Sequence, residues 1–444
     1  MKKLLTLAVI SIVAFTLFSC TGKSKNNTAA QTETKKQEET VMKPATTESN
    51  GMAAKFMKSA EKAKEEAKAQ VAEIEGFEQK EPLYESAARH GFKLGTVINP
   101  QNLDRKVYTD MVKADFNSIT AANEFKAYSL LSMSLSQKSE NGMPVMNYYR
   151  ADSIAQFAKE NGIGIRGHVL VWDAYMPDWF FRENYRYDTE LVSSDVMKKR
   201  LQHYIEDVIT HFETNFPGVV YCWDVVNEAV GDNANEYKEG DERHVRTIRG
   251  GTTNYFYDVI GPDYVEFSCK YARETVKKLN ANIKLFYNDY STFYSPKREA
   301  IGKLIESINK NEKLCDGVGM QGYVGGYGQQ AGCMSANDIN QFKNAIVFYS
   351  NLGLEVHVTE LALRNYEKAK AVQHANYYEK FFKMLASVAD EYKTLTCVAI
   401  WGICDNPSLS KDDYSYKMNG PYCGMYNYDC SKKPEFFMAA KALE

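Results

Sequence analysis

The fold is decided by the sequence VYCWDVVNE at residues 220–228. β-Branched and aromatic residues dominate this stretch, and it is too apolar for a half-exposed segment, so it predicts a buried β-strand. It ends on Asn227 and Glu228, after which the chain becomes polar. Enzymes built from parallel strands and helices carry catalytic groups at the C-terminal ends of such strands. On its own, the pattern fits a core strand followed by a solvated glutamate equally well.

A second stretch, LEVHVTE at residues 354–360, repeats this design. It is rich in β-branched residues, apolar on one parity, and ends on Glu360. Two carboxylates on two strand ends are the minimal set for glycoside hydrolysis, which needs a proton donor and a nucleophile. One carboxyl group must stay protonated near neutral pH while the other stays ionised. The repeat therefore favours a catalytic interpretation of Glu228 and Glu360.

Strand and helix patterns alternate along the chain from residue 82 onward. The strand patterns cover residues 92–98, 116–120, 163–171, 219–226, 283–288, 317–321, 354–359 and 396–401. The clearest helical patterns cover residues 149–160, 196–214, 264–280, 335–352 and 367–389. Eight strands alternating with helices predict right-handed crossovers and an α/β fold, a closed parallel (β/α)8 TIM barrel.

An open, doubly wound sheet is the alternative to the barrel. Its dinucleotide motif is matched by letters in GVGMQG at residues 317–322. That motif requires its glycines in a turn that opens a helix, whereas here the segment is itself a strand pattern and glycines and tyrosines follow it. We therefore favour the barrel.

Composition limits the partners and cofactors. A net charge of −3 argues against nucleic acid as the main partner. Apart from Cys20, the cysteines form no CxxC motif and have no histidine at ligand spacing, so we expect no metal and no cofactor. Cys222 and Cys397 lie in strand patterns and are expected in the core. Cys423 and Cys430 could bridge a surface loop, and the sequence leaves that open.

The N-terminal region predicts export. Residues 1–19 combine two lysines with an apolar run and lead into LFSC, which resembles a bacterial lipoprotein box. That resemblance implies a lipid on Cys20. An ordinary signal peptide with a chance cysteine is the alternative. Residues 20–51 predict a disordered tether and residues 52–80 a charged helical spacer, which leaves a domain at 81–444. We expect an exported, monomeric lipoprotein that is bound to the membrane only through this lipid and faces the cell surface or the periplasm.

Seven motifs together resemble glycoside hydrolase family 10. They are RGHVLVW at 166–172, WDVVNE at 223–228, FYDVIG at 256–261, YNDY at 287–290, GMQ at 319–321, TEL at 359–361 and IWG at 400–402. They run in order between about residue 83 and residue 440, mostly at the predicted strand ends. The resemblance implies a (β/α)8 barrel and the activity of a retaining β-1,4-xylanase, with a xylan-like polysaccharide as the partner.

The resemblance also implies roles for individual residues. Glu228 would be the acid/base, Glu360 the nucleophile, and Asn227 the partner of the sugar 2-hydroxyl. The remaining substrate-binding positions are Asn123, Lys126, His168, Trp172, Tyr290, Gln321, Tyr323 and Trp401. Of these, His168 and Lys126 would hold the sugar at the cleavage point, and Trp172 and Trp401 would stack on sugar faces. Trp179, Trp223 and His357 are interpreted as packing residues.

Six positions depart from the family pattern, all at or near the glycone half of the cleft. They are Ala122 for a glutamate, Asp173 for a histidine, Tyr175 for a glutamine, Tyr323 for a histidine beside the nucleophile, Ala362 for an aspartate, and Leu409 for a tryptophan. These departures keep open a decorated or different β-linked polysaccharide as the substrate. A non-catalytic carbohydrate-binding lipoprotein is the alternative from another class. The retention of Glu228 and Glu360 argues against it.

Overall fold

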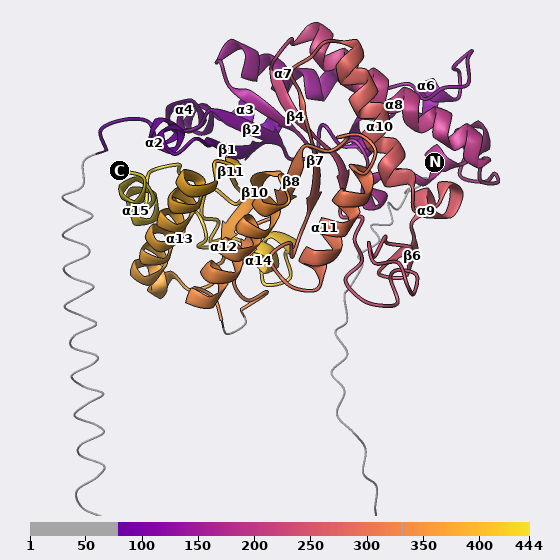
Figure 1. The fold of residues 1–444 in the computed structure, drawn as a ribbon. Helices are drawn as coiled ribbons and strands as arrows, with labels where there is room; N and C mark the ends of the chain where they lie inside the picture. The colour runs from indigo at the N-terminus through magenta and orange to yellow at the C-terminus, as the bar shows by residue number, and fades with distance from the viewer. Residues whose placement is uncertain (1–78, 330–331) are drawn as a thin grey trace, which may run out of the picture. The chain divides into compact units, whose positions relative to one another are not determined.

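The computed structural model describes residues 79–329 and 332–444 (Figure 1). The predicted signal segment, the tether and all but the last two residues of the predicted spacer lie outside the described residues. Within the described part of the chain, no helix is long and apolar enough to cross a membrane.

The domain is built on a closed barrel of parallel strands. Its members are β1 (Lys93–Ile98), β2 (Ser118–Ala121), β3 (Gly164–Gly167), β4 (Val220–Asn227), β7 (Lys284–Asp289), β8 (Gly317–Met320), β10 (Glu355–Leu363) and β11 (Leu395–Ile400). Each strand pairs in parallel with the next, and β11 pairs with both β10 and β1, which closes the sheet. All eight predicted strands are present, and the predicted (β/α)8 barrel is confirmed.

Helices form the outer layer of the barrel (Figure 1). The longer ones are α4 (Lys106–Asp115), α7 (Tyr149–Glu160), α8 (Ser194–Asn215), α10 (Tyr264–Lys278), α11 (Lys297–Ile308), α12 (Ala336–Asn351), α13 (Ala371–Tyr392) and α15 (Pro434–Ala442). In α8, the buried residues Leu201, Ile205, Val208 and Phe212 recur at helical spacing and face the sheet. The five predicted helical segments are all helices, with ends that differ by a few residues.

Short elements decorate the connections between these strands and helices. The helices are α2 (Leu83–Arg89), α3 (Pro100–Leu103), α5 (Ala127–Leu130), α6 (Met133–Ser136), α9 (Tyr255–Ile260) and α14 (Tyr414–Asn419). Single 3-10 turns cover Asp173–Tyr175, Asp178–Phe181, Glu183–Tyr185 and Lys368–Lys370. Strands β5 (Ile248–Arg249) and β6 (Thr252–Thr253) form an antiparallel hairpin after β4, and β9 (Tyr323–Val324) pairs with the end of β10.

The barrel interior holds a charged layer as well as apolar side chains. Arg166 forms a buried ion pair with Asp224, and its Nε donates to His357 Nδ1 at 3.1 Å. Asp224 also bonds His168 Nδ1 at 2.8 Å, so this layer orients a predicted site residue. His357 is 2% exposed and stacks on Phe286 with ring centroids 4.0 Å apart. It packs inside the barrel, as predicted, but it also belongs to the charged layer through its hydrogen bonds with Arg166 and Thr396.

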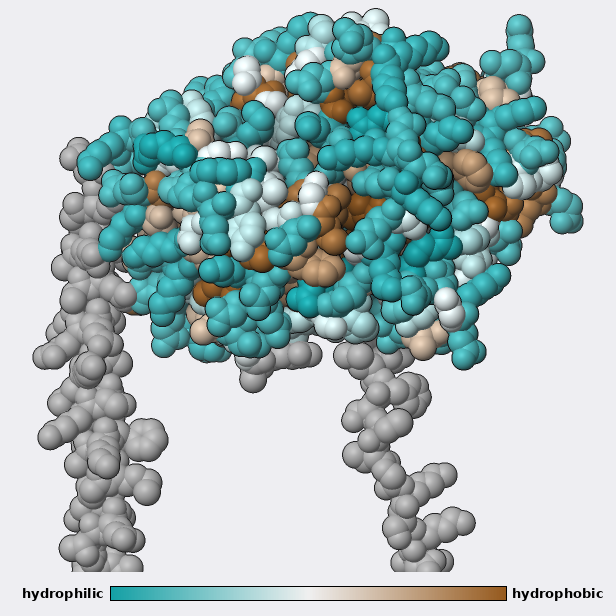
Figure 2. Space-filling model, viewed as in Figure 1, coloured by the Kyte–Doolittle hydropathy of each residue, from teal (hydrophilic) through white to brown (hydrophobic). Residues whose placement is uncertain are grey.

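Trp223 is fully buried and packs against Phe125 and Phe212, as the sequence predicted. Its ring fills the space beside Gly167, where an added Cβ would lie 2.4 Å from it. Trp179 is buried too. The face drawn in Figure 2 is mostly hydrophilic, with hydrophobic side chains in small, separate areas.

The bridge between Cys423 and Cys430, which the sequence left open, does not form. Cys423 Sγ lies 3.4 Å from the Gly402 carbonyl oxygen, whereas Cys430 Sγ lies 3.8 Å from Cys404 Sγ. The chain between the two cysteines passes through Tyr426, whose backbone bridges to Cys404, and this brings Cys430 beside Cys404 instead. Cys423 and Cys430 are both free thiols.

Candidate active site

Glu228 follows Asn227, the last residue of β4, at the C-terminal end of the barrel. Its φ is +55°, a left-handed conformation that is rare for residues other than glycine. Such strain is commonly found at functional sites. The Glu228 amide donates to the Asn288 carbonyl oxygen at 2.9 Å, which fixes this turn against the neighbouring strand.

The sequence predicted Glu360 at the end of its strand. In the structure it lies inside β10, which continues to Leu363. The strand continues to Leu363 because β9 adds a second parallel ladder, in which Tyr323 is opposite Ala362. The pairing of β10 with β11 shifts register between Val358 and Leu361, which brackets Glu360 with an irregularity. A short strand of two residues has no clear sequence signal, so this extension was not predictable.

The carboxyl group of Glu360 interacts with the Tyr323 hydroxyl, the His168 imidazole and the Lys126 ammonium group. The Tyr323 hydroxyl donates to Glu360 Oε2 at 2.5 Å. Burial raises the pKa of Glu360, and His168, the Tyr323 hydrogen bond and Lys126 act in the opposite direction. Burial lowers the pKa of Lys126, although Glu360 and Glu228 favour its charged form. The residue that replaces a family histidine therefore still contacts the predicted nucleophile.

The carboxyl group of Glu228 accepts one hydrogen bond on each oxygen. Gln321 Nε2 donates to Oε1 at 3.0 Å, and Arg249 Nη1 donates to Oε2 at 2.8 Å. Arg249 is also bound by Asp173 at two positions, with distances of 2.7 and 3.0 Å. The sequence analysis identified Asp173 as a departure but missed Arg249, which ends β5 in a hairpin that carries no recognisable motif.

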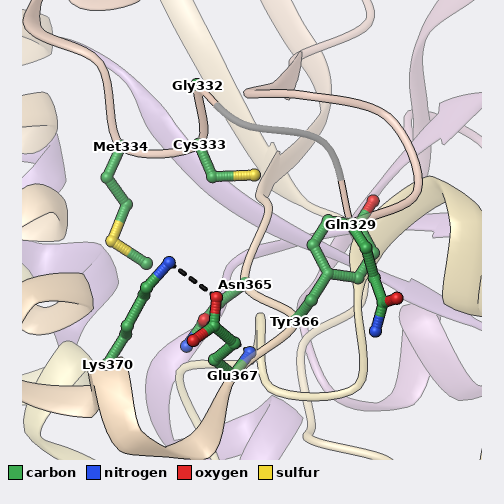
Figure 3. A pocket seen from close by; sticks show the side chains of 8 residues that line it. All are labelled: Gln329, Gly332, Cys333, Met334, Asn365, Tyr366, Glu367 and Lys370. Atoms are coloured by element: carbon green, nitrogen blue, oxygen red, sulfur yellow. Dashed lines mark hydrogen bonds and ion pairs between the residues drawn. The ribbon is translucent and has the colours of Figure 1, made fainter. Parts of the chain in front are cut away.

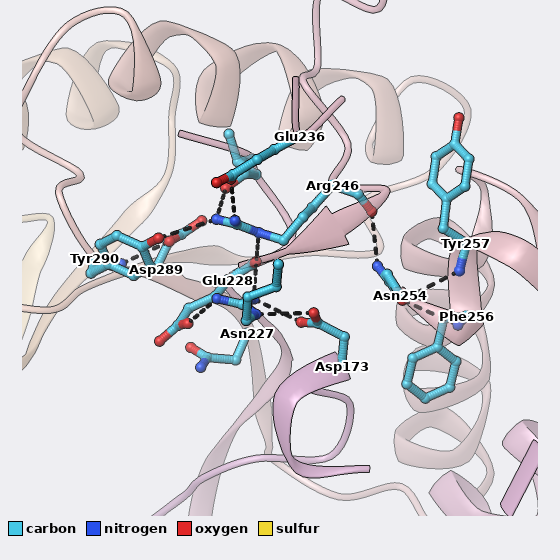
Figure 4. A network of polar contacts seen from close by, with 12 residues as sticks. Asp173, Asn227, Glu228, Glu236, Arg246, Asn254, Phe256, Tyr257, Asp289 and Tyr290 are labelled. Atoms are coloured by element: carbon cyan, nitrogen blue, oxygen red, sulfur yellow. Dashed lines mark hydrogen bonds and ion pairs between the residues drawn. The ribbon is translucent and has the colours of Figure 1, made fainter. Parts of the chain in front are cut away.

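A second arginine, Arg246, lies beside this group (Figure 4). Arg246 donates to the carbonyl oxygens of Glu228 and Val230, at 3.2 and 2.7 Å, and forms an ion pair with Glu236. It also donates to the Tyr290 hydroxyl at 3.2 Å. The predicted binding residue Tyr290 is thus engaged in this network. Arg246, Glu236 and Lys297, which pairs with Asp289, were missed because polar loop residues do not reveal their distant partners.

Two donors in the cleft have no partner among the described residues. Asn227 Oδ1 accepts from Asn288 Nδ2 at 2.8 Å and from Gln321 Nε2 at 3.3 Å, while Asn227 Nδ2 is buried and unbonded. The indole Nε1 of Trp172 is likewise buried and unbonded. Buried donors are normally bonded, so these two are available to an oxygen of a bound molecule.

Aromatic rings line the cleft near Lys126. Trp172 and Tyr175 have ring centroids 4.4 Å apart, and Tyr175 and Tyr128 have centroids 5.4 Å apart. Lys126 Nζ lies 4.7 Å from the Tyr175 ring centroid and donates to Asn123 Oδ1 at 3.0 Å. The predicted residues Asn123, Lys126 and Trp172 are therefore brought together, and Tyr128 is an aromatic neighbour that the sequence analysis missed.

The chain after β11 adds the last side of the cleft. Trp401 is half-buried, and its amide donates to the Leu361 carbonyl oxygen at 2.8 Å, beside Glu360. Leu409 is half-buried in the loop before α14. Tyr414, the first residue of α14, is 73% exposed. Tyr414 was not predicted as a site residue.

A separate pocket of about 330 Å³ lies beyond β10 (Figure 3). Gln329, Cys333, Tyr366 and Glu367 are among its lining residues, and Lys370 forms an ion pair with Glu367 at 2.7 Å. None of the predicted site residues lines it. Within the described residues, no group of three or more histidine, cysteine, aspartate or glutamate side chains could hold a metal ion.

Comparisons with known proteins place these features in a family. The model of glycosyl hydrolase family 10 matches residues 83–442. A putative endo-1,4-β-xylanase of Caldicellulosiruptor saccharolyticus is 38% identical over 326 residues, which cover 70% of this chain and 95% of that protein. Endo-1,4-β-xylanase A of Thermotoga maritima is 34% identical over 344 residues, which cover 76% of this chain but only 28% of that protein.

A solved structure shows the same likeness. The CBM22-1 and GH10 modules of the N-terminal endo-1,4-β-D-xylanase 10B of Clostridium thermocellum, complexed with xylohexaose, align with a TM-score of 0.71 at 29% identity. The alignment covers 82% of this chain and 68% of that one.

Proposed function

The chain belongs to glycosyl hydrolase family 10, and on that premise we propose that it hydrolyses β-1,4-xylosidic bonds in xylan or xylo-oligosaccharides with retention of configuration. As a family member it is a glycoside hydrolase. The observation that carries the proposal is the pair of buried carboxyl groups, Glu228 and Glu360, each bonded by its own set of donors at the C-terminal end of the barrel.

The first step forms a covalent glycosyl-enzyme. Glu360 attacks the anomeric carbon, and Glu228 transfers its proton to the departing glycosidic oxygen. The Tyr323 hydroxyl, on Oε2 of Glu360, leaves the other carboxylate oxygen as the attacking atom. Asn227 Nδ2, which has no protein partner in the described residues, is available to the sugar 2-hydroxyl. Such a contact strengthens as the transition state forms.

The second step releases the sugar. Glu228, now a carboxylate, takes a proton from water as the water oxygen attacks the anomeric carbon. The bond to Glu360 breaks, and its carboxylate is restored. Two inversions at the same carbon give net retention.

The finer substrate preference follows from the altered glycone half. Both carboxylate oxygens of Asp173 accept a hydrogen bond from Arg249, and the Asp173 side chain is only 5% exposed, so it offers little to sugar hydroxyls. Ala122 has no hydrogen-bonding side chain, and Tyr175 packs its ring against Trp172. We therefore favour a weak second glycone subsite, with space for a side group. A decorated β-linked polysaccharide is the second candidate substrate.

The test is a product profile on plain and decorated xylans with a reducing-sugar assay. We expect xylo-oligosaccharides from plain xylan, and more rapid release where side groups are present. A protein that binds xylan but releases no reducing sugar from it, or from aryl xylobiosides, would contradict the proposal and support the binding class. The double variant Glu228→Ala with Glu360→Ala is the control for background activity.

We also propose that the enzyme is an exported lipoprotein, anchored through Cys20. The support is the apolar segment at residues 1–19 and the LFSC box that ends it. Changing Cys20→Ser should move the protein from the membrane fraction to the soluble exported fraction, because the polar stretch that follows offers no other attachment. An unchanged distribution in cell fractionation would remove this proposal.

A further inference from the structure

Arg249 contacts the proposed acid/base more closely than any other charged group that the structure describes. Its guanidinium donates to Glu228 Oε2 at 2.8 Å and to the Glu228 carbonyl oxygen at 2.9 Å. The same guanidinium donates a hydrogen bond to each carboxylate oxygen of Asp173. The inference that follows rests on the proposed function, since it assigns a role within the same reaction.

The charges of Glu228, Arg249 and Asp173 allow Glu228 to gain and lose a proton. With Glu228 ionised, the Arg249 guanidinium pairs with both carboxylates. With Glu228 protonated, Arg249 and Asp173 remain as a closed, neutral ion pair. Neither state leaves a buried charge without a partner, which would be costly. Asp173 is 5% exposed at its side chain and Arg249 18%, so water can replace little of this pairing.

The hydrogen bonds also distinguish the two oxygens of Glu228. A guanidinium has donors only, so Oε2 cannot present a proton toward Arg249. Oε1 faces the Gln321 amide, whose Nε2 is shared with Asn227 Oδ1 at 3.3 Å. A protonated Oε1 can still accept from this neutral amide while its own proton is offered to the substrate, whereas Oε2, beside the cationic guanidinium, is stabilised as the unprotonated oxygen.

Arg249 is fixed in place by the hairpin that carries it. It ends β5, and Gly250 and Gly251 follow, both with positive φ, before the chain returns as β6. Burial disfavours the charged form of Arg249, but Glu228 and Asp173 outweigh it and raise the pKa of the guanidinium. It therefore remains a permanent cation at this position.

We propose that Arg249, held by Asp173, is a positioning residue. It directs the catalytic proton to Oε1 of Glu228 and stabilises the negative charge of the Glu228 carboxylate when that proton leaves. During formation of the glycosyl-enzyme, the proton moves from Glu228 to the leaving oxygen. The carboxylate that remains is then paired with Arg249. Release of the sugar reverses this transfer, with water as the proton source.

The test compares two leaving groups in the full-length enzyme. Phenyl xylobioside needs a proton on its leaving oxygen, whereas 2,4-dinitrophenyl xylobioside does not. Arg249→Met should lower kcat/KM for the phenyl substrate by about 10- to 100-fold, the usual size for loss of a charge-assisted hydrogen bond. It should lower kcat/KM for the dinitrophenyl substrate far less. Arg249→Lys should restore part of the kcat/KM lost on the phenyl substrate. Asp173→Asn should also lower kcat/KM for the phenyl substrate more than for the dinitrophenyl substrate, but by a smaller factor than Arg249→Met.

Arg243→Met is the matched control. Arg243 lies in the same connection after β4, but pairs with Asp241 and Asp263 and makes no contact with Glu228. The ratio of kcat/KM values on the two substrates should be the same for Arg243→Met as for the wild type. Cleavage of the dinitrophenyl substrate also reports that each variant is folded.

An equal fall on both substrates would make Arg249 a structural or binding residue and overturn the inference. No change on either substrate would overturn it as well, as would a lysine variant no better than the methionine one. These outcomes presuppose an active wild type. A wild-type enzyme that cleaves neither xylobioside would contradict the proposed function instead, so the two failures are distinguishable.

Discussion

The two carboxyl groups that we propose as catalytic are equally buried but are held in different ways. Glu228 and Glu360 are each 7% exposed. Glu228 bonds to a guanidinium that it shares with Asp173, whereas Glu360 bonds to the neutral hydroxyl of Tyr323. Glu228, which must alternate between acid and carboxylate in the proposed mechanism, is paired with a cation, Arg249, that has Asp173 as a second partner. The group that must stay ionised until it bonds carbon is given a hydrogen-bond donor.

The pKa of the nucleophile follows from this arrangement. Burial raises the pKa of Glu360, while His168, Tyr323 and Lys126 oppose the rise. In the proposed mechanism Glu360 acts as the carboxylate, so activity should be present above its pKa and lost as the pH falls through it. Because that pKa is raised, we expect the acid limb of kcat/KM to lie above the value of an ordinary glutamate, about 4.3.

Removing either carboxyl group is the strongest test of their different roles. Glu360→Ala and Glu228→Ala should each reduce the rate on xylan by several orders of magnitude, since each removes an essential step. With azide, Glu228→Ala should give a product of retained configuration, because azide attacks the glycosyl-enzyme. Glu360→Ala should give the inverted product by direct attack. Swapped configurations, measured by NMR, would reverse the assignment.

Changing Tyr323→Phe tests the hydroxyl beside the nucleophile. Loss of this hydrogen bond should lower kcat/KM on xylobiosides by about 10- to 100-fold, or about 1–3 kcal/mol of transition-state binding. The hydrogen bond lowers the pKa of Glu360, so its loss should raise that pKa. The acid limb of the kcat/KM profile should then move toward neutral pH. An unmoved limb would show that Tyr323 only packs.

The smallest expected effect concerns the second glycone sugar. Aryl xylobioside should exceed aryl xyloside in kcat/KM by less than about 100-fold, or about 2.7 kcal/mol. The reason is that Ala122 and Tyr175 replace groups that would bind this sugar, and remote binding energy normally raises the rate. Ala122→Glu should widen the ratio about tenfold, if one hydrogen bond is regained. A wild-type ratio of many thousands would prove the subsite intact.

The sequence predicted the barrel well because its strands are short apolar runs that end in polar motifs. Val220–Asn227 and Glu355–Leu363 were located within a few residues, although the extension of the latter by β9 was missed. Tyr323 takes the position of a family histidine beside the nucleophile, and its hydroxyl donates to Glu360. Arg249 was not foreseen, because the partner of a charged residue in a hairpin depends on a fold contact and not on local pattern. The same limitation explains why the sequence left the pairing of Cys430 open.

Closure of the barrel has a consequence for how the chain folds. β1 and β11 pair through Gly95 and Ala399, which are about 300 residues apart in sequence. Contacts between such distant segments make folding slow, since a long loop must close before they form. Until the last strand has been synthesised, β1 lacks one of its neighbours and the sheet remains open. For the exported lipoprotein that we propose, this delay favours passage across a membrane before the enzyme folds.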